Sequence, residues 1–163
     1  MARVLLVDHN ESVLKNVRAV LLQEGLEICG EAATGRRAIE EAVRLKPDFI
    51  VLDHSLPDLT GVQVAYEIRQ RLGNVRIVFF TFHDEAVISA AARVVGADAF
   101  VSKSSLGELV LALRRLIEGR APEGAVGLGA GLDRAVSPQI PNPEIQDPFA
   151  ARRPSPVPSR APK

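Results

Sequence analysis

Residues 4–12 read VLLVDHNES, an apolar run that ends in an acid and an imidazole. A continuous apolar run is expected for a strand that is covered on both faces, as in a parallel sheet. The polar residues after it are typical of the start of a helix. Asp8 and His9 therefore either cap a turn or lie in a crevice at the carboxyl end of a sheet. The rest of the chain has to distinguish these two interpretations.

The same change from apolar strand to amphipathic helix recurs along the first 120 residues. The predicted strands are RVLLV, LEICGEA, DFIVLD, VRIVFFT and DAFVS, which begin at residues 3, 26, 48, 75 and 98. The predicted helices have apolar residues at helical spacing, with Gly25 and Pro47 as stops after the first two. Their predicted N-caps, from the second helix on, are Thr34, Thr60, Asp84 and Ser105. Strict alternation implies right-handed crossovers and a mostly parallel sheet with helices on both faces.

The composition changes near residue 120, where the alternation ends. Nine of the eleven prolines lie between Pro122 and Pro162, next to the glycine-rich piece GAVGLGAGL. We interpret residues 1–120 as one domain and residues 121–163 as a disordered tail rich in proline and glycine. The prolines of the tail exclude the paired helices of a DNA-reading helix-turn-helix, so no direct DNA binding is expected.

The composition also limits the classes of partner. Lysine plus arginine equals aspartate plus glutamate at 20 each, which gives no electrostatic case for non-specific binding to nucleic acid or membranes. The single Cys29 cannot form an internal disulfide, and no stretch is long and apolar enough to span a bilayer. We expect a soluble cytoplasmic protein without membrane contact.

Polar residues gather at the carboxyl ends of the predicted strands. Asp8 and His9 follow the first strand, Asp53 ends the third, Thr81 ends the fourth and Lys103 follows the fifth. Ligands of open parallel sheets bind outside these ends, near the topological switch point. Each residue alone has an ordinary structural explanation, but their common location predicts a shared crevice.

At this point the chain resembles the receiver domain of two-component response regulators, over about residues 2–119. FIVLDHSLPDLTG, from residue 49, is similar to that family's strand with its phosphorylated aspartate and the loop after it. Asp8 precedes Asp53 by 45 residues, and Thr81 and Lys103 follow it by 28 and 50. GADAFVSKSS looks like the family's fifth strand, with Phe100 at its aromatic switch position. The resemblance implies a flavodoxin-like doubly wound (βα)5 fold, an α/β domain with five parallel strands in the order 2-1-3-4-5.

The resemblance also implies roles for these residues. Asp53 is expected to accept a phosphoryl group from a histidine kinase or phosphotransfer protein. Lys103 and Thr81 are expected to contact the phosphoryl oxygens, and Thr81 and Phe100 to switch conformation together. Mg²⁺ is the expected cofactor, held by Asp8, Asp53 and the backbone carbonyl of Ser55. The phosphorylated protein would signal through a downstream partner docked on the fourth helix, fifth strand and fifth helix.

The chain departs from the family at two positions. Receivers usually carry two acids after the first strand, and here the second position is His9, a doubtful ligand for a hard cation. Loss of one charge there is expected to weaken Mg²⁺ binding roughly 10- to 300-fold, from Coulomb's law with partial solvation. Phe82 occupies a position that is usually small, where its ring would either shield Asp53 or lie along the surface.

Three classes of function stay open at this stage. The first is a phosphoacceptor without a recognisable output domain, which is no enzyme beyond at most weak autophosphatase activity. The second is a degenerate receiver that binds its partner without phosphorylation, which His9 favours. The third is a phosphatase with an aspartate nucleophile, but such enzymes need an acid at the position of Ser55. A nucleotide-binding protein would need a glycine-rich loop after the first strand, and DHNES has none.

Overall fold

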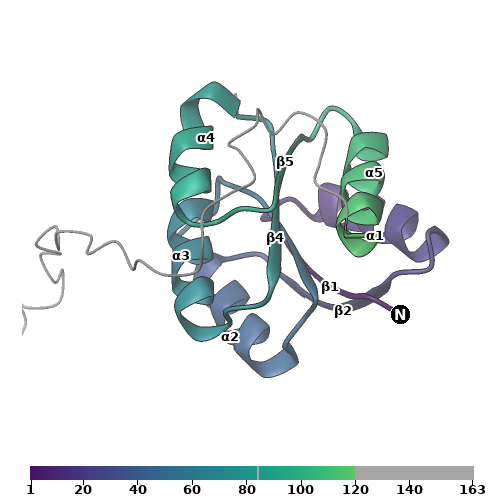
Figure 1. Ribbon diagram of the computed structural model, residues 1–163, viewed down its shortest axis with the longest axis horizontal. Coiled ribbons are helices and arrows are strands. Elements are labelled where there is room, and N and C mark those ends of the chain that lie inside the picture. Colours follow the sequence, from purple (N-terminus) through teal and green to yellow (C-terminus); the bar gives the residue numbers. More distant parts are fainter. Residues whose placement is uncertain (84, 120–163) are drawn as a thin grey trace, which may run out of the picture. The chain divides into compact units, whose positions relative to one another are not determined.

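The computed structural model describes residues 1–83 and 85–119 (Figure 1). Strands and helices alternate throughout this part of the chain, as the sequence predicts. The strands are β1 (Arg3–Val7), β2 (Glu27–Ala32), β3 (Phe49–Leu52), β4 (Arg76–Thr81) and β5 (Ala99–Ser102). The helices are α1 (Glu11–Gln23), α2 (Gly35–Leu45), α3 (Gly61–Arg71), α4 (Glu85–Val94) and α5 (Leu106–Ile117).

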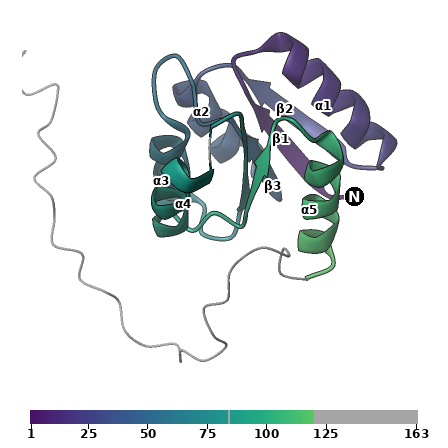
Figure 2. The same ribbon diagram turned by 90° about the horizontal axis from the view of Figure 1, so that it is seen from above.

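The five strands form one parallel sheet in the order β2-β1-β3-β4-β5, which confirms the predicted flavodoxin-like topology. The sheet forms the middle layer. Helices α1 and α5 cover one face, and α2, α3 and α4 cover the other (Figures 1 and 2). Strand β2 is added on one side of β1, and β3 to β5 are added on the other, so the topological switch point lies between the carboxyl ends of β1 and β3.

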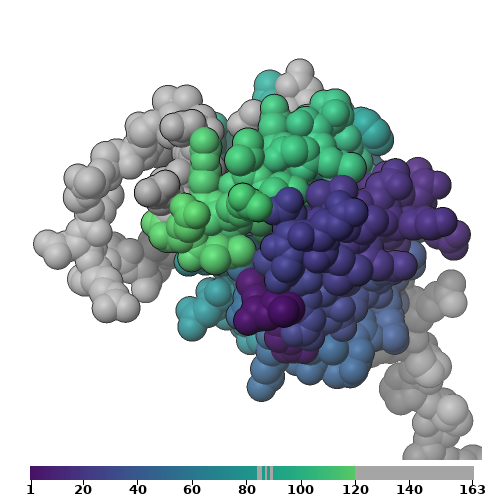
Figure 3. Space-filling model, turned by 90° about the vertical axis from the view of Figure 1, so that its right-hand side faces the viewer, coloured from purple at the N-terminus to yellow at the C-terminus, as the bar shows by residue number. Residues whose placement is uncertain are grey.

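Each face of the sheet has its own apolar core. On one face the strand residues Val4 and Val78 pack with Leu113 of α5, and on the other Leu5 and Ile50 pack with Ile68 of α3. Alternate residues of one strand therefore enter opposite cores, and this is why the strands read as unbroken apolar runs. On the α1–α5 side the two helices lie side by side at the surface (Figure 3).

Local capping explains where the helices begin. The side chains of Thr34, Thr60 and Ser105 accept hydrogen bonds from backbone amides of the first turns of α2, α3 and α5, as predicted. Asn10 caps α1 through the amides of Ser12 and Val13. Asp8 is therefore not the cap of this helix. Its Oδ1 instead accepts the Asn10 amide at 2.9 Å in the turn before α1, and its Oδ2 faces the sheet edge. The predicted cap Asp84 lies outside the described residues.

Two further expectations concern the predicted tail and the absence of a membrane-spanning helix. The predicted tail at residues 121–163 is not among the described residues, so its boundary stays a prediction. None of the helices in the described part has the length and apolar character needed to cross a bilayer.

Candidate functional site

The two acids meet because β1 and β3 are neighbours in register. Val7 pairs with Leu52, so the next residues, Asp8 and Asp53, leave the sheet side by side. The Asp53 amide donates to the Val7 carbonyl at 2.9 Å and extends the ladder by one step. The side chains of Asp8 and Asp53 are both almost completely buried, at 5% and 3% exposure. Two buried carboxylates at one edge require a positive partner.

Lys103 supplies that partner. Its backbone amide donates to the Thr81 carbonyl at 3.0 Å, which places the residue one step past β5. Its Nζ lies 2.5 Å from Asp8 Oδ2 and 3.0 Å from Asp53 Oδ2, and the side chain is only 4% exposed. We call Asp8, Asp53 and Lys103 the charged notch. The convergence predicted from the strand ends is thus present.

His9 stands at the mouth of the charged notch. Its Nδ1 lies 3.5 Å from Asp53 Oδ2 and 3.9 Å from Asp8 Oδ1, while half of its side chain is exposed. One ligand atom from each of Asp8, His9 and Asp53 falls within 4.8 Å of the other two. The imidazole therefore faces the carboxylates from the solvent side.

Thr81 is completely buried and its hydroxyl meets a second histidine. The His83 amide donates to Thr81 Oγ1 at 3.3 Å, and His83 Nδ1 also lies 3.3 Å from that oxygen. The same Nδ1 is 3.4 Å from Ser55 Oγ. His83 thereby joins the end of β4 to the loop after β3. The only signal for these contacts in the sequence is the position of His83, two residues after Thr81.

The two aromatic residues of interest occupy different environments. The partly buried Phe100 stacks on Phe79, with ring centroids 6.0 Å apart. Phe82 is 72% exposed, and its ring centroid lies 5.5 Å from Lys103 Nζ. Phe82 therefore lies at the surface, which is one of its two predicted placements, with its ring beside the Lys103 ammonium. Shielding of Asp53 by this ring stays a prediction.

The loop that presents Asp53 and Ser55 is held at both ends. The Gly61 amide donates to the His54 carbonyl at 2.8 Å, and Ser55 forms an isolated bridge with Thr60. A Cβ at Gly61 would lie 2.5 Å from the Asp53 carbonyl oxygen, so glycine is required there by close approach.

Asp58 fastens the same loop to the start of α2, a contact that the sequence analysis missed. Its carboxylate accepts hydrogen bonds from the amides of Gly35 at 2.6 Å, Arg36 at 3.0 Å and Leu59 at 3.0 Å. Desolvation opposes ionisation, but these backbone donors together hold the pKa of Asp58 below its usual value. No pattern along the sequence indicates the contact with α2, because Gly35 and Arg36 lie 23 and 22 residues before Asp58.

His54 points into the same region from the residue after Asp53. Its ring lies edge-on to that of His83, with centroids 5.4 Å apart. Burial, aided by repulsion from His83, lowers the pKa of His54 against the opposing attraction of Asp53.

Asp8, Asp53 and His9 together could hold a divalent cation, but the three groups do not all suit the same metal. The carboxylates of Asp8 and Asp53 are the hard oxygen ligands that Mg²⁺ prefers. The third ligand group is the imidazole nitrogen of His9, which suits borderline metals better than it suits Mg²⁺. The acids therefore fit the implied magnesium ion, and His9 does not.

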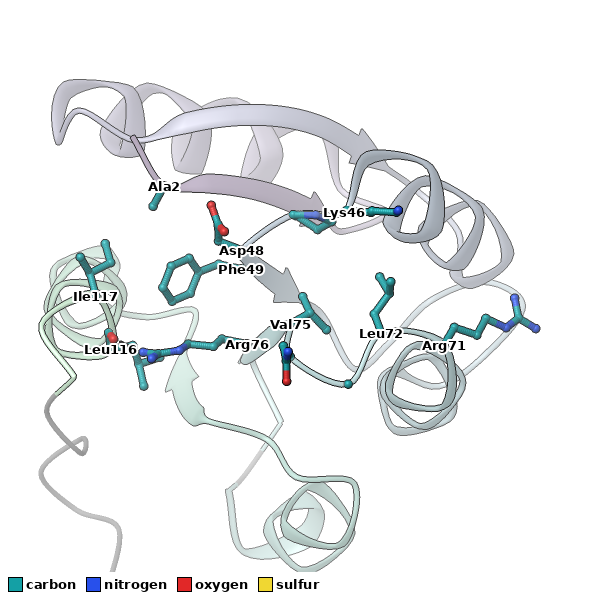
Figure 4. A pocket seen from close by; sticks show the side chains of 13 residues that line it. Ala2, Lys46, Asp48, Phe49, Arg71, Leu72, Val75, Arg76, Leu116 and Ile117 are labelled. Carbon is teal, nitrogen blue, oxygen red and sulfur yellow. Dashed lines mark hydrogen bonds between the residues drawn. The ribbon is translucent and has the colours of Figure 1, made fainter.

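A hollow of about 640 Å³ opens at the opposite edge of the sheet and has no part in the notch. It lies between the amino ends of the strands and the end of α5, where Arg76 reaches the Leu116 carbonyl and lies over the Phe49 ring (Figure 4). The helical spacing of the apolar residues in α5 predicts an inward position for Ile117, but Ile117 lines this hollow and is 48% exposed. It lies in the last turn of α5, where the sheet no longer covers the helix.

The fold and the notch define a doubly wound α/β domain with two buried aspartates and a lysine at its topological switch point. Residues 4–114 match the family model of the response regulator receiver domain. The chain belongs to this family, whose members work in two-component systems. The resemblance seen in the sequence is thereby confirmed.

Relatives and solved structures agree with this assignment. The response regulator protein VraR of Staphylococcus epidermidis is 34% identical over 121 residues, which is 73% of this chain and 58% of that protein. A two-component response regulator of the LuxR family from Aurantimonas sp. SI85-9A1 has a TM-score of 0.71 at 33% identity, covering 74% of this chain and 88% of that one. This chain thus spans somewhat more than half the length of the curated relative.

A third similarity concerns DNA. The crystal structure of a DNA-binding response regulator of the LuxR family from Staphylococcus aureus has a TM-score of 0.67 at 23% identity, and it covers 71% of this chain and 98% of that one. At this identity the similarity shows the fold alone. The absence of direct DNA binding therefore stays a prediction for this chain.

Proposed function

We propose that this protein is a phosphoacceptor, which takes a phosphoryl group on Asp53 from a phosphohistidine of a histidine kinase or phosphotransfer protein. The observation that carries the proposal is the position of Lys103 Nζ, within 3.0 Å of both Asp8 and Asp53 in a buried notch. An ammonium ion there is a fixed charge beside the nucleophile. Such preorganised charge is what phosphoryl transfer needs most.

The transfer is a single displacement at phosphorus. A carboxylate oxygen of Asp53 forms the new P–O bond as the P–N bond to the donor imidazole breaks. The electron pair of that bond stays on the imidazole, which leaves neutral if its other nitrogen already carries a proton. Lys103 neutralises charge on the phosphoryl oxygens as a point cation. Thr81 then donates its hydroxyl hydrogen bond to a phosphoryl oxygen.

A divalent cation completes the charge balance. Asp8, Asp53 and the Ser55 backbone carbonyl would hold Mg²⁺, which supplies electrostatic stabilisation to the transferring group when it is bound. The notch residues serve as acceptor and counter-charge, so we regard the protein as a signalling acceptor and not as an enzyme with turnover.

Signal output would follow from Thr81 and Phe100. Thr81 must leave the His83 contact to reach a phosphoryl oxygen, which frees space beside β4 and β5. Phe100 lies on β5 and would turn into that space. Helices α4 and α5 each carry an exposed apolar side chain, Val94 and Leu111. The face of α4, β5 and α5 is the proposed docking surface of a downstream protein.

A second function is favoured by one observation, the placement of His9 at the mouth of the notch in place of a second acid. A receiver that cannot bind Mg²⁺ well would act as a phosphorylation-independent interaction module. Intact Asp53, Lys103 and Thr81 favour the first proposal.

The deciding experiment measures mass. The protein is incubated with a phosphohistidine donor protein, or with phosphoramidate and a divalent cation, and intact mass is recorded. One added phosphoryl group is expected for the wild type and for the control Asp48→Asn, whose carboxylate lies at the far edge of the sheet beside the Arg3 amide. No addition is expected for Asp53→Asn. Absence of any adduct with every divalent metal, together with unchanged partner binding in Asp53→Asn, would support the second function.

A further inference from the structure

Asp8, Asp53 and His9 form a mixed ligand set, and we propose that it selects a borderline divalent ion, in the Fe²⁺ to Zn²⁺ range, over Mg²⁺. The inference deepens the proposed function, on which it rests for the presence of a cation. Its observation is that ligand atoms of Asp8, His9 and Asp53 converge within 4.8 Å. Two of these groups are carboxylates and one is an imidazole.

The orientation of His9 supports its role as a ligand. Its Nδ1 faces Asp53 Oδ2 at 3.5 Å and Asp8 Oδ1 at 3.9 Å, so the nitrogen is already directed into the notch. The two acids are fixed by burial, whereas half of the His9 side chain is exposed. The imidazole can therefore adjust to an ion, while the carboxylates define the position of that ion.

The chemistry of the three groups then decides between metals. Carboxylates bind both classes of cation, but imidazole nitrogen suits zinc, nickel and iron and is a poor ligand for Mg²⁺. Mg²⁺ also requires near-ideal octahedral oxygen geometry and gives up its waters reluctantly. A nitrogen in place of an oxygen removes a ligand for Mg²⁺ and provides one for a borderline ion.

The charge of the notch acts in the same direction. Two carboxylates and the Lys103 ammonium leave one negative charge when His9 is neutral, and an acid at that position would leave two. Mg²⁺ binding depends almost wholly on this charge. Borderline ions retain part of their affinity through bonding to nitrogen, so they lose less from the missing charge.

Other donors in the chain have to be separated from the notch. His54 and His83 lie close to each other beside the notch, and Cys29 is a thiol on β2. The variant His54→Gln/His83→Gln and the variant Cys29→Ser serve as controls, because each removes donors outside the proposed ligand set.

The test compares Mg²⁺ and Co²⁺ binding by titration calorimetry in the wild type, His9→Asp and His9→Ala. The wild type is expected to bind Co²⁺ at least ~100-fold more tightly than Mg²⁺, by the order of metal affinities for nitrogen-containing sites. His9→Asp is expected to tighten Mg²⁺ roughly 10- to 300-fold, from the added charge near the ion. Co²⁺ should change by less than that factor. Paramagnetic shifts of the His9 ring protons by Co²⁺ would identify the ligand directly.

The outcomes are distinct. If His9→Asp changes both affinities by the same factor, or if Co²⁺ leaves the His9 ring protons unshifted, imidazole is not a ligand and the inference is wrong. Loss of Co²⁺ binding in the two control variants but not in His9→Ala would also overturn it. Failure of phosphorylation with the metal preference intact would contradict the proposed function alone, because calorimetry needs no phosphodonor.

Discussion

Replacing Lys103 by methionine removes the cation that bridges Asp8 and Asp53, and we expect it to destabilise the fold strongly. The Nζ–carboxylate distances of 2.5 and 3.0 Å correspond to gross attractions of about 7 and about 6 kcal/mol at an effective dielectric of 20. Desolvation of the ions offsets much of this. Breaking a buried ion pair typically costs ~3–5 kcal/mol because the remaining charge stays buried without a partner. We expect that cost for Lys103→Met.

The two acids also repel each other once the lysine is gone. Ligand oxygens within 4.8 Å repel by at least about 3 kcal/mol at the same dielectric. Asp53→Asn removes this repulsion. In the Lys103→Met background it should recover roughly 2 kcal/mol after screening, whereas alone it should be close to neutral. The two substitutions are therefore expected to be strongly non-additive.

Urea unfolding followed by far-UV circular dichroism measures these free energies, since the chain has no tryptophan and one tyrosine. Lys15→Met is the matched control, because Lys15 is exposed on α1, and it should change stability by less than ~0.5 kcal/mol. If Lys103→Met alone is too unstable to fold, a folded double variant would itself show the coupling, because the second substitution would then restore stability that the first removes. Additive effects, or a cost below about 1 kcal/mol for Lys103→Met, would refute a coupled buried notch.

Three further predictions test the surroundings of the notch. Gly61→Ala should lower the free energy of unfolding by at least ~2 kcal/mol, because the added Cβ would lie 2.5 Å from the Asp53 carbonyl oxygen. Gly73→Ala is the control, because the space around Gly73 is open. Equal losses of stability in the two variants would contradict the close approach at Gly61. Asp58→Ala should cost about 1 kcal/mol at neutral pH through the lost amide bonds. The folded pKa of Asp58 lies below the usual 3.8, so its contribution to stability is full above pH 3.8 and disappears as the pH falls through the folded pKa. A stability difference between wild type and Asp58→Ala that persists in acid would contradict this explanation. Phe82→Ala should raise the rate of phosphorylation by small donors and the rate of loss of the phosphoryl group, each ~2- to 5-fold. This factor corresponds to the free energy of one exposed cation–π contact. Unchanged rates would show that the ring does not shield the acceptor.

The sequence was sufficient for the fold because its local signals agree with one another. Unbroken apolar runs specified buried parallel strands, and Thr34, Thr60 and Ser105 marked helix starts that the structure has at those places. Strand ends predicted the notch for the same reason, since residues that follow adjacent parallel strands must share one edge. Ile117 was misplaced because periodicity does not reveal where the sheet stops covering a helix.

Contacts between distant loops were beyond sequence reasoning. Asp58 binds amides 22 and 23 residues away, and no residue type there requires an acid. His83 lies two residues after Thr81, but it reaches Ser55 only because β3 and β4 are neighbours. Such contacts depend on the conformations of two loops, and the sequence pattern of a single segment predicts neither conformation.

The net charge of the notch links the need for a cation to the presence of His9. Two acids and one lysine leave a net negative charge at the acceptor, and an incoming phosphoryl group brings more of the same sign. Lys103 alone cannot balance both, because it already compensates Asp8 and Asp53 at ion-pair distance. If Asp53 accepts a phosphoryl group as proposed, a divalent ion is expected to accompany that group, and the affinity of the ion would then limit how much phosphorylated protein can form. With a second acid at the position of His9, Mg²⁺ would be held by charge alone. With imidazole there, the choice of metal becomes a chemical one, and the identity of that ion is expected to decide whether the notch accepts a phosphoryl group at all.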